Sequence, residues 1–181
     1  MGRVKTDDGF TLIEVMIAMM ILTMGLLSLV GVATAAVQRA SESSPSLIAR
    51  EKAREAIESV HTARDTGELS WAKIQNVSAG GVFLNGEQPL KLSGADGLVN
   101  TADDTTVETV RSPGADKLLN TADDQVIPLN DYKRTILIEP LNYDATGTLN
   151  PNLRKITVTV KYKVGQLWRD YIIVTYISAY A

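Results

Sequence analysis

The sequence predicts an α+β fold in which a long amino-terminal helix, transmembrane in its first half, packs on a carboxyl-terminal antiparallel β-sheet. Two observations predict it. Residues 15–38 form an apolar run without a charged side chain, and residues 132–178 hold segments in which apolar and polar residues alternate. Of the 181 residues 45% are hydrophobic, so the chain is long enough to bury one core and is not intrinsically disordered.

Composition excludes several classes of functional site. The chain has no cysteine, which excludes disulfides, thiolate metal sites and a cysteine nucleophile. A single histidine, His61, excludes His-rich metal centres and argues against a Ser-His-Asp triad. The net charge of −3 argues against a nucleic-acid binder, and no set of converging catalytic groups stands out. We therefore expect no enzymatic activity and no nucleic-acid partner.

The apolar run from Val15 to Gln38 is long enough to cross a membrane. As a helix its 24 residues would extend about 36 Å, more than the roughly 30 Å of a bilayer core. Arg3 and Lys5 lie ahead of the run. The positive-inside rule therefore places the amino terminus in the cytoplasm and the chain after Arg39 outside.

Two simpler interpretations of this run are a secretory signal peptide and a plain single-pass anchor. A signal peptide has an apolar stretch of about 7–15 residues and a small-residue cleavage site, which residues 33–36 could supply. Glu14 argues against both interpretations. A carboxylate at the start of an apolar run costs a few kcal/mol unless it is paired.

The residues around Glu14 form a specific motif. Gly9 and Phe10 are followed by Thr-Leu-Ile-Glu and the apolar run, and a short basic leader precedes them. This order resembles the type IV prepilin signature. The resemblance implies that a prepilin peptidase cuts between Gly9 and Phe10 and methylates the new amino group of Phe10. It also implies that Glu14 pairs with the amino terminus of a neighbouring subunit, an attraction that is strong when both charges are desolvated.

The resemblance also implies a pilin-like organisation. The implied segments are a cytoplasmic leader peptide (1–9), a transmembrane and filament-core helix (10–38), an amphipathic outer helix (39–64) and a periplasmic or extracellular β-rich head (65–181). The Gly-Leu-Leu run at residues 25–27 and the acid- and alanine-rich stretch at 49–60 are similar to PilV-type minor pilins and to the minor pseudopilin I of type II secretion.

The predicted function is a minor pilin of a type IV pilus, with a minor pseudopilin of a type II secretion system as the alternative. A second alternative is a membrane-tethered calcium-binding or adhesive domain that does not assemble. The implied partners are other pilin or pseudopilin subunits, the prepilin peptidase and the inner-membrane assembly platform. Before assembly the chain would be a single-pass inner-membrane protein with a cytoplasmic amino terminus, and afterwards part of a pilus or a periplasmic pseudopilus.

Residues 47–64 repeat apolar residues at intervals of three and four, a pattern that predicts an amphipathic helix. Pro45 lies just ahead of it, and a proline inside a helix lacks a backbone donor and clashes one turn back. Two arrangements are consistent with this: one long helix bent near Pro45, or two helices joined by a loop at 41–46.

Alternation of apolar and polar residues predicts three strands, at 132–139, 155–164 and 168–178. Pro140 is expected to end the first strand, and a loop rich in Asn and Gly is expected at 141–153. The pair Gly165-Gln166 predicts a two-residue type II′ turn between the other two strands. Residues 82–84, flanked by glycines, are a further candidate strand.

An acidic tandem repeat interrupts the head. Residues 94–104 (GADGLVNTADD) and 114–124 (GADKLLNTADD) match at nine of eleven positions. Residues 94–124 contain seven acids and two bases, a charge of −5, so the rest of a chain with net charge −3 carries +2. All the excess negative charge therefore lies in this stretch.

The repeats are candidate calcium sites, because Ca²⁺ prefers six to eight oxygen ligands and the loops combine aspartates with Gly and Asn turn residues. They partly resemble the calcium-holding loop of the major pseudopilin of type II secretion. One or two ions would be held by Asp96, Asn100, Asp103, Asp104, Asp116, Asn120, Asp123 and Asp124. The first repeat is the better candidate, because Lys117 brings a positive charge to the second. The alternative is a pair of solvated turns in which Asp and Asn bond their own backbone.

Overall fold

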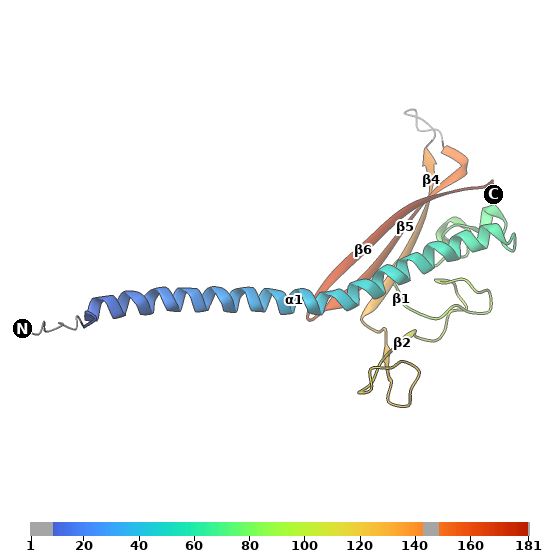
Figure 1. Cartoon of the computed structure of the whole chain (residues 1–181). Helices are drawn as coiled ribbons and strands as arrows, with labels where there is room; N and C mark the ends of the chain where they lie inside the picture. Colours follow the sequence, from blue (N-terminus) through green and yellow to red (C-terminus); the bar gives the residue numbers. More distant parts are fainter. Residues whose placement is uncertain (1–8, 143–148, 181) are drawn as a thin grey trace, which may run out of the picture. The chain divides into compact units, whose positions relative to one another are not determined.

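The computed structural model describes residues 9–142 and 149–180 (Figure 1). The chain divides into two compact units, residues 1–43 and residues 44–181. Helix α1 (Leu12–Asp65) contributes to both units, and all the strands lie in the second. The predicted α+β arrangement, a long apolar amino-terminal helix and a carboxyl-terminal antiparallel sheet, is confirmed.

The first unit consists of the amino-terminal part of α1. Its segment Leu12–Val37 is long and apolar enough to cross a membrane, and its large apolar side chains are exposed. Hydroxyl groups in this segment are satisfied inside the helix. Thr23 donates to the carbonyl of Met19 at 2.6 Å, and Ser28 donates to that of Met24 at 2.8 Å. These bonds keep polar donors away from lipid, so the segment fits membrane anchoring.

Helix α1 continues through Pro45 without a break. The prediction of one long helix is therefore confirmed, and the alternative of two helices with a loop at 41–46 is wrong. An internal proline costs about 3 kcal/mol, which burial of the following turns offsets. The helix ends at Asp65, and Gly67 follows with a φ of 68°, the left-handed conformation common just after a helix.

The buried stripe of α1 consists of small apolar residues spaced by three and four positions. Its members are Ala49, Ala53, Ala56, Val60 and Ala63. Small side chains let the helix axis lie close to the sheet, where they join the strand residues of one continuous core. In Figure 1 this part of the helix runs along one face of the long strands.

The main sheet has four antiparallel strands in the order β1-β4-β5-β6. Their bounds are Gln88–Pro89, Tyr132–Asn142, Leu149–Val164 and Leu167–Ser178. The helix-facing side chains of the long strands are the predicted alternating apolar set, with Ile156, Val158 and Val160 fully buried. Val164 pairs with Leu167 across the predicted two-residue turn, where Gly165 has a φ of 61°.

The prediction that Pro140 ends its strand is wrong. Strand β4 continues to Asn142, and the register shifts between Pro140, which pairs with Arg154, and Leu141, which pairs with Asn150. A β-bulge of this kind accommodates a residue that has no N–H to donate. The predicted loop at 141–153 is therefore strand at both ends, and its middle, residues 143–148, lies outside the described residues.

The predicted strand at 82–84 is also wrong. Only Phe83 forms an isolated bridge there, with Asn76, and its ring is fully buried. The Asn76 side chain takes the place of a neighbouring strand at this edge of β4. Its amide donates to the carbonyl of Ile136 at 2.7 Å and its oxygen accepts from the N–H of Ile138 at 2.8 Å. A side-chain amide can thus satisfy an edge that the sequence pattern leaves open.

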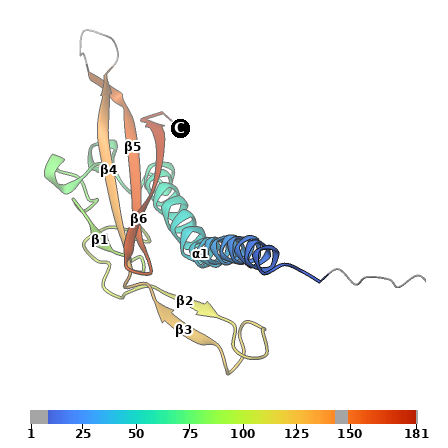
Figure 2. The same ribbon diagram turned by 90° about the vertical axis from the view of Figure 1, so that its left-hand side faces the viewer.

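A separate two-stranded sheet carries the second acidic repeat. Strands β2 (Thr109–Ser112) and β3 (Gln125–Pro128) pair from Thr109↔Pro128 to Ser112↔Gln125, so residues 113–124 connect them. We call residues 109–128 the repeat arm. Figure 2 shows β2 and β3 lying apart from the long strands.

Candidate functional site

The predicted cleavage position lies in accessible backbone ahead of α1. Gly9 and Phe10 are outside the helix, both are exposed, and Phe10 is 83% exposed. A side chain at Gly9 would meet no atom within 4 Å, so packing does not require glycine there. The predicted leader, apart from Gly9, lies outside the described residues. The position of Gly9 is consistent with selection by a peptidase rather than by the fold.

Glu14 lies in the first turn of α1. The Glu14 N–H donates to the Thr11 hydroxyl at 3.3 Å, so Thr11 caps the helix three residues ahead of a glutamate. This is the spacing of a capping box, and a carboxylate near a helix amino terminus is favoured by the helix dipole. The TLIE sequence therefore also starts the helix, a signal that our sequence analysis missed.

The surroundings of Glu14 are apolar. It borders a shallow groove of about 540 Å³ formed with Phe10, Val15, Ala18, Met19 and Leu22. Within residues 9–142 and 149–180 no cation pairs with it. A carboxylate on an apolar helix is costly away from water unless it is paired or neutralised.

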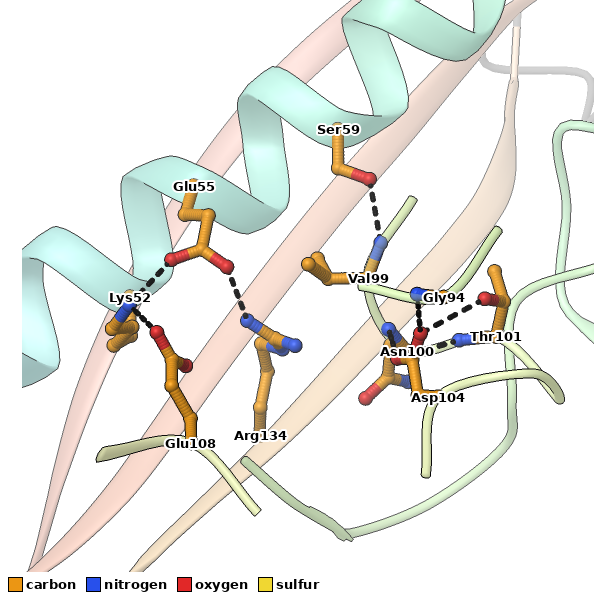
Figure 3. Close-up of polar contacts among 10 residues, drawn as sticks. All are labelled: Lys52, Glu55, Ser59, Gly94, Val99, Asn100, Thr101, Asp104, Glu108 and Arg134. Atoms are coloured by element: carbon orange, nitrogen blue, oxygen red, sulfur yellow. Dashed lines mark hydrogen bonds and ion pairs between the residues drawn. The ribbon is translucent and has the colours of Figure 1, made fainter. Parts of the chain in front are cut away.

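The first acidic repeat forms a compact loop that is held together by its own carboxylates. The Asp103 carboxylate accepts the Asp96 N–H at 3.2 Å and the Thr101 hydroxyl at 2.8 Å. These bonds, that of Thr101 first, lower the pKa of Asp103. Asp104 is buried and accepts the N–H groups of Gly94 (3.0 Å) and Asn100 (2.6 Å) (Figure 3).

Three ligand atoms in this loop lie close enough to share an ion. One carboxylate oxygen from each of Asp96, Asp103 and Asp104 lies within 4.8 Å of the other two. In the part of the chain that the structure describes, this is the one such group of acidic or histidine side chains. The side-chain amide of Asn100, the fourth predicted ligand, donates to the carbonyl of Leu84 at 3.2 Å, and its Oδ1 is buried without a hydrogen-bond partner.

The second repeat shares most of these hydrogen bonds. Asp123 accepts the Asp116 N–H at 3.3 Å and the Thr121 hydroxyl at 2.8 Å, and Asp124 accepts the Asn120 N–H at 2.7 Å. The Thr121 bond is the main one that lowers the pKa of Asp123. The structure therefore brings each repeat's predicted residues together within its own loop.

One glycine and one asparagine in each repeat are required by the backbone of the loop. A Cβ on Gly94 would overlap the Asp103 carboxylate, and a Cβ on Gly114 would overlap that of Asp123. Asn100 and Asn120 have φ values of 68° and 67°, a conformation that asparagine tolerates better than most residues. The asparagines thus shape the turns, and their ligation of an ion stays a prediction.

The repeats differ in what covers them. Leu98 and Val99 of the first repeat are 5% and 3% exposed, and the Val99 N–H donates to the Ser59 hydroxyl of α1 at 2.9 Å. The corresponding Leu118 and Leu119 are 62% and 56% exposed. The first loop is therefore part of the core, whereas the second presents its apolar pair to solvent.

A partly buried charge cluster lies beside the first repeat (Figure 3). Lys52 of α1 pairs with Glu55 at 2.7 Å and with Glu108. Arg134 of β4 is 1% exposed, and its Nη1 lies 3.7 Å from Glu55 Oε1. Burial lowers the pKa of Arg134, and the charges of Glu55, Glu108 and Asp104 oppose that effect. This cluster joins the helix, the sheet and the loop.

Comparison with known families identifies the amino-terminal segment. The family model described as the prokaryotic N-terminal methylation motif matches residues 5–30. No curated protein and no solved structure gives a significant match to the chain. The predicted type IV prepilin-like family is confirmed by this motif, which contains Gly9, Phe10 and Glu14. The motif supports a pilin- or pseudopilin-like substrate of prepilin peptidase that assembles with other pilin subunits.

Proposed function

We propose that this prepilin-like chain is a minor pilin, a non-catalytic building block of a type IV pilus. The observation that carries the proposal is the exposed carboxylate of Glu14, the one charged side chain in the membrane-length segment Leu12–Val37, directly after the cleavage motif. Cleavage between Gly9 and Phe10 would create an ammonium group four residues ahead of that carboxylate. A filament of such subunits can pair each Glu14 with the amino terminus of a neighbour.

The pairing is consistent with both states of the subunit, in the membrane before assembly and in the filament afterwards. In the membrane pool, Glu14 and the new amino terminus lie near the lipid headgroups, where an ionisable group is less costly than at the bilayer centre. In an apolar filament core, each of these charges is stable only beside the other. Their separation along the helix would thus set the axial offset between neighbouring subunits, while the outer half of α1 carries the β-rich head.

A minor pseudopilin of a type II secretion system is the second candidate. The three clustered carboxylates of the first repeat favour this system, since the loop partly resembles the calcium-holding loop of its major pseudopilin. Both candidates are processed by the peptidase and assemble into a filament. They differ in the location of that filament, which is at the cell surface for a pilus and in the periplasm for a pseudopilus.

The location of the processed chain tests the choice. In a peptidase-positive host that builds type IV pili, we expect processed chain in the filaments sheared from the cell surface. As a control, a host with a type II secretion system but no pili should retain it with the membranes. Absence from sheared pili, together with a secretion defect when the gene is deleted, would instead favour the pseudopilin.

Calcium binding by the first repeat is a further expectation. Asp96, Asp103 and Asp104 would supply part of the oxygen set and water the rest. We expect Ca²⁺ at about 100 times its dissociation constant to stabilise the full-length chain by about 2.7 kcal/mol. Differential scanning fluorimetry in detergent, with and without a chelator, measures this effect.

Matched variants identify the loop responsible. Asp103→Asn should remove the calcium-dependent shift in the unfolding midpoint, whereas Asp123→Asn, the same change in the second repeat, should leave most of it. An equal shift in the Asp103→Asn chain would exclude the first repeat as the site.

A further inference from the structure

Strand β6 is an unprotected edge of the main sheet. It is the last strand in the order β1-β4-β5-β6, and its ladder with β5 runs from Leu167 to Ser178 without a register shift (Figure 2). The segment Ile172–Ser178 contains no charged residue, proline or glycine. Natural edge strands are usually protected by short length, a proline, a charge or a bulge, because their free backbone groups can pair with another chain. This segment has none of these protections.

The opposite edge of the same sheet is protected. Strand β1 covers β4 over only two residues, and one of them is Pro89. Further along β4, the side chain of Asn76 bonds to the backbone of Ile136 and Ile138 in place of a neighbouring strand. The fold therefore closes one edge of the sheet with its own residues and leaves the other edge open.

The free backbone groups of β6 alternate along the strand. Lys163, the partner of Trp168, donates its N–H to the carbonyl of Asp131 next to β4, so Trp168 and every second residue after it direct their N–H and C=O groups away from β5. In the part of the chain that the structure describes, no backbone group from outside the β5–β6 ladder bonds to β6. The residues with outward groups in the uncharged segment include Ile172, Val174 and Tyr176.

A groove follows this edge on the side of α1. Its volume is about 440 Å³, and it is lined by Arg54, Ile57 and Glu58 of α1 and by residues 173–175 of β6. No described residue of β5 lines the groove, so it lies along the outer side of β6. The charges of Arg54 and Glu58 are opposite, so the lining has no net charge. The groove can therefore receive uncharged side chains of a strand that is added beside β6.

The other side of the edge is apolar. Trp168, Ile172, Val174 and Tyr176 project from β6 on the side that faces away from α1, and each is 45–58% exposed. An added strand would place its remaining side chains beside this apolar stripe and cover part of it. Because the outward backbone groups repeat every second residue, the neighbour that satisfies them is an extended chain.

We propose that the outer edge of β6 pairs with an extended, uncharged strand of a different subunit of the filament. The inference rests on the proposed function, since a minor subunit is flanked in the filament by subunits of other kinds. A second copy of this chain does not suit this role, because a β6–β6 pair closes at two copies and leaves neither edge free for those neighbours. The pairing adds a contact between the heads to the contact through Glu14.

A charged substitution at the edge tests the pairing. Val174→Lys introduces the kind of side chain that protects natural edge strands. The matched control is Leu137→Lys. Leu137, Thr157 and Val174 form one cross-strand row, and Leu137 is 43% exposed against 46% for Val174. Leu137 lies two strands from the edge, which is roughly 10 Å farther from an added strand.

The measurement is an immunoblot of filaments sheared from a host that builds type IV pili. We expect at least about tenfold less Val174→Lys chain than wild-type or Leu137→Lys chain, because the loss of a few backbone hydrogen bonds weakens the contact by a factor of this size. Thermal unfolding of the full-length variants in detergent should give similar midpoints for the two lysine variants, which shows that the head is folded in both.

A proline variant separates the backbone from the side chain. Val174→Pro removes an N–H that β5 does not use, so the ladder inside the sheet is kept and only the outer edge loses a donor. The folded proline chain should be depleted from filaments as strongly as the lysine variant. If the proline chain does not fold, the comparison of the two lysine variants decides the test.

Several results would overturn the pairing. Equal incorporation of the two lysine variants would remove it and keep the pilin function, and equal depletion would show that the contact is the exposed sheet face instead of its edge. The chain has no cysteine of its own, so disulfide-linked dimers of Val174→Cys after mild oxidation of the membranes would identify a second copy as the occupant. Absence of the wild-type chain from the filaments would instead remove the proposed function, and the pairing with it.

Discussion

Replacing Glu14 with alanine is expected to leave processing intact and to remove most of the chain from filaments. The peptidase acts at Gly9 and Phe10, which lie outside the helix, so the substitution four residues later leaves the cleaved bond accessible. In a filament, however, the amino terminus of the neighbour would be left as an unpaired charge in an apolar core. Such a loss costs about 3–5 kcal/mol, which corresponds to a decrease in incorporation of about a hundredfold or more.

The measurement is an immunoblot of processed chain in the membrane and sheared-filament fractions. Glu51→Ala is the matched control, because Glu51 is an exposed carboxylate on the same helix, outside the apolar segment. It should be processed and incorporated normally. Incorporation of Glu14→Ala at the level of the control would contradict the proposed pairing.

Replacing Arg134 with alanine is expected to give the largest loss of stability in the head. The substitution removes a fully buried cation and leaves Glu55 and Glu108 with Lys52 as their remaining partner in the cluster. The Glu55 side chain is 36% exposed and both glutamates keep Lys52 as a partner, so little buried charge is left unpaired. The loss therefore comes mainly from the cavity that the truncation leaves beside the first repeat, about 2–5 kcal/mol.

A longer apolar side chain separates these contributions. Arg134→Met fills most of the space without a buried charge, so its loss should be smaller than that of the alanine variant. Arg54→Ala, an exposed cation on α1, should change stability by less than about 0.5 kcal/mol. Thermal unfolding of the full-length variants in detergent, followed by circular dichroism, ranks the three variants by their stability. Equal midpoints for Arg134→Ala and Arg54→Ala would mean that the cluster does not stabilise the head.

The main elements could be predicted because each has a strong periodic signal. The uncharged run gives a membrane-length helix, the spacing of Ala49, Ala53 and Ala56 gives its buried stripe, and strict alternation gives the long strands. The errors came from residues that break a pattern locally. Pro140 and the Asn- and Gly-rich residues after it indicate a loop, yet a β-bulge lets the ladder continue beyond the proline.

The candidate sites could be predicted only where their residues are neighbours in the sequence. Gly9, Phe10 and Glu14 form a contiguous motif, and each acidic repeat bonds mainly within itself, so both were visible. The difference between the repeats could not be predicted, because their sequences are nearly identical. Only contact with Ser59 and the core buries the first repeat. Arg134 was also missed, although it shares the strand face of Ile136 and Ile138, where a charged residue signals a buried partner.

The amino terminus of the mature chain tests the central claim most directly. Intact mass and amino-terminal sequencing should be done on chain purified from membranes of a peptidase-positive host, with a peptidase-deficient host as the control. The prepilin assignment predicts a chain that begins at N-methylated Phe10 in the first host and at Met1 in the second. A chain that begins at Met1 in both hosts, or near residue 36 after signal-peptide cleavage, would contradict it.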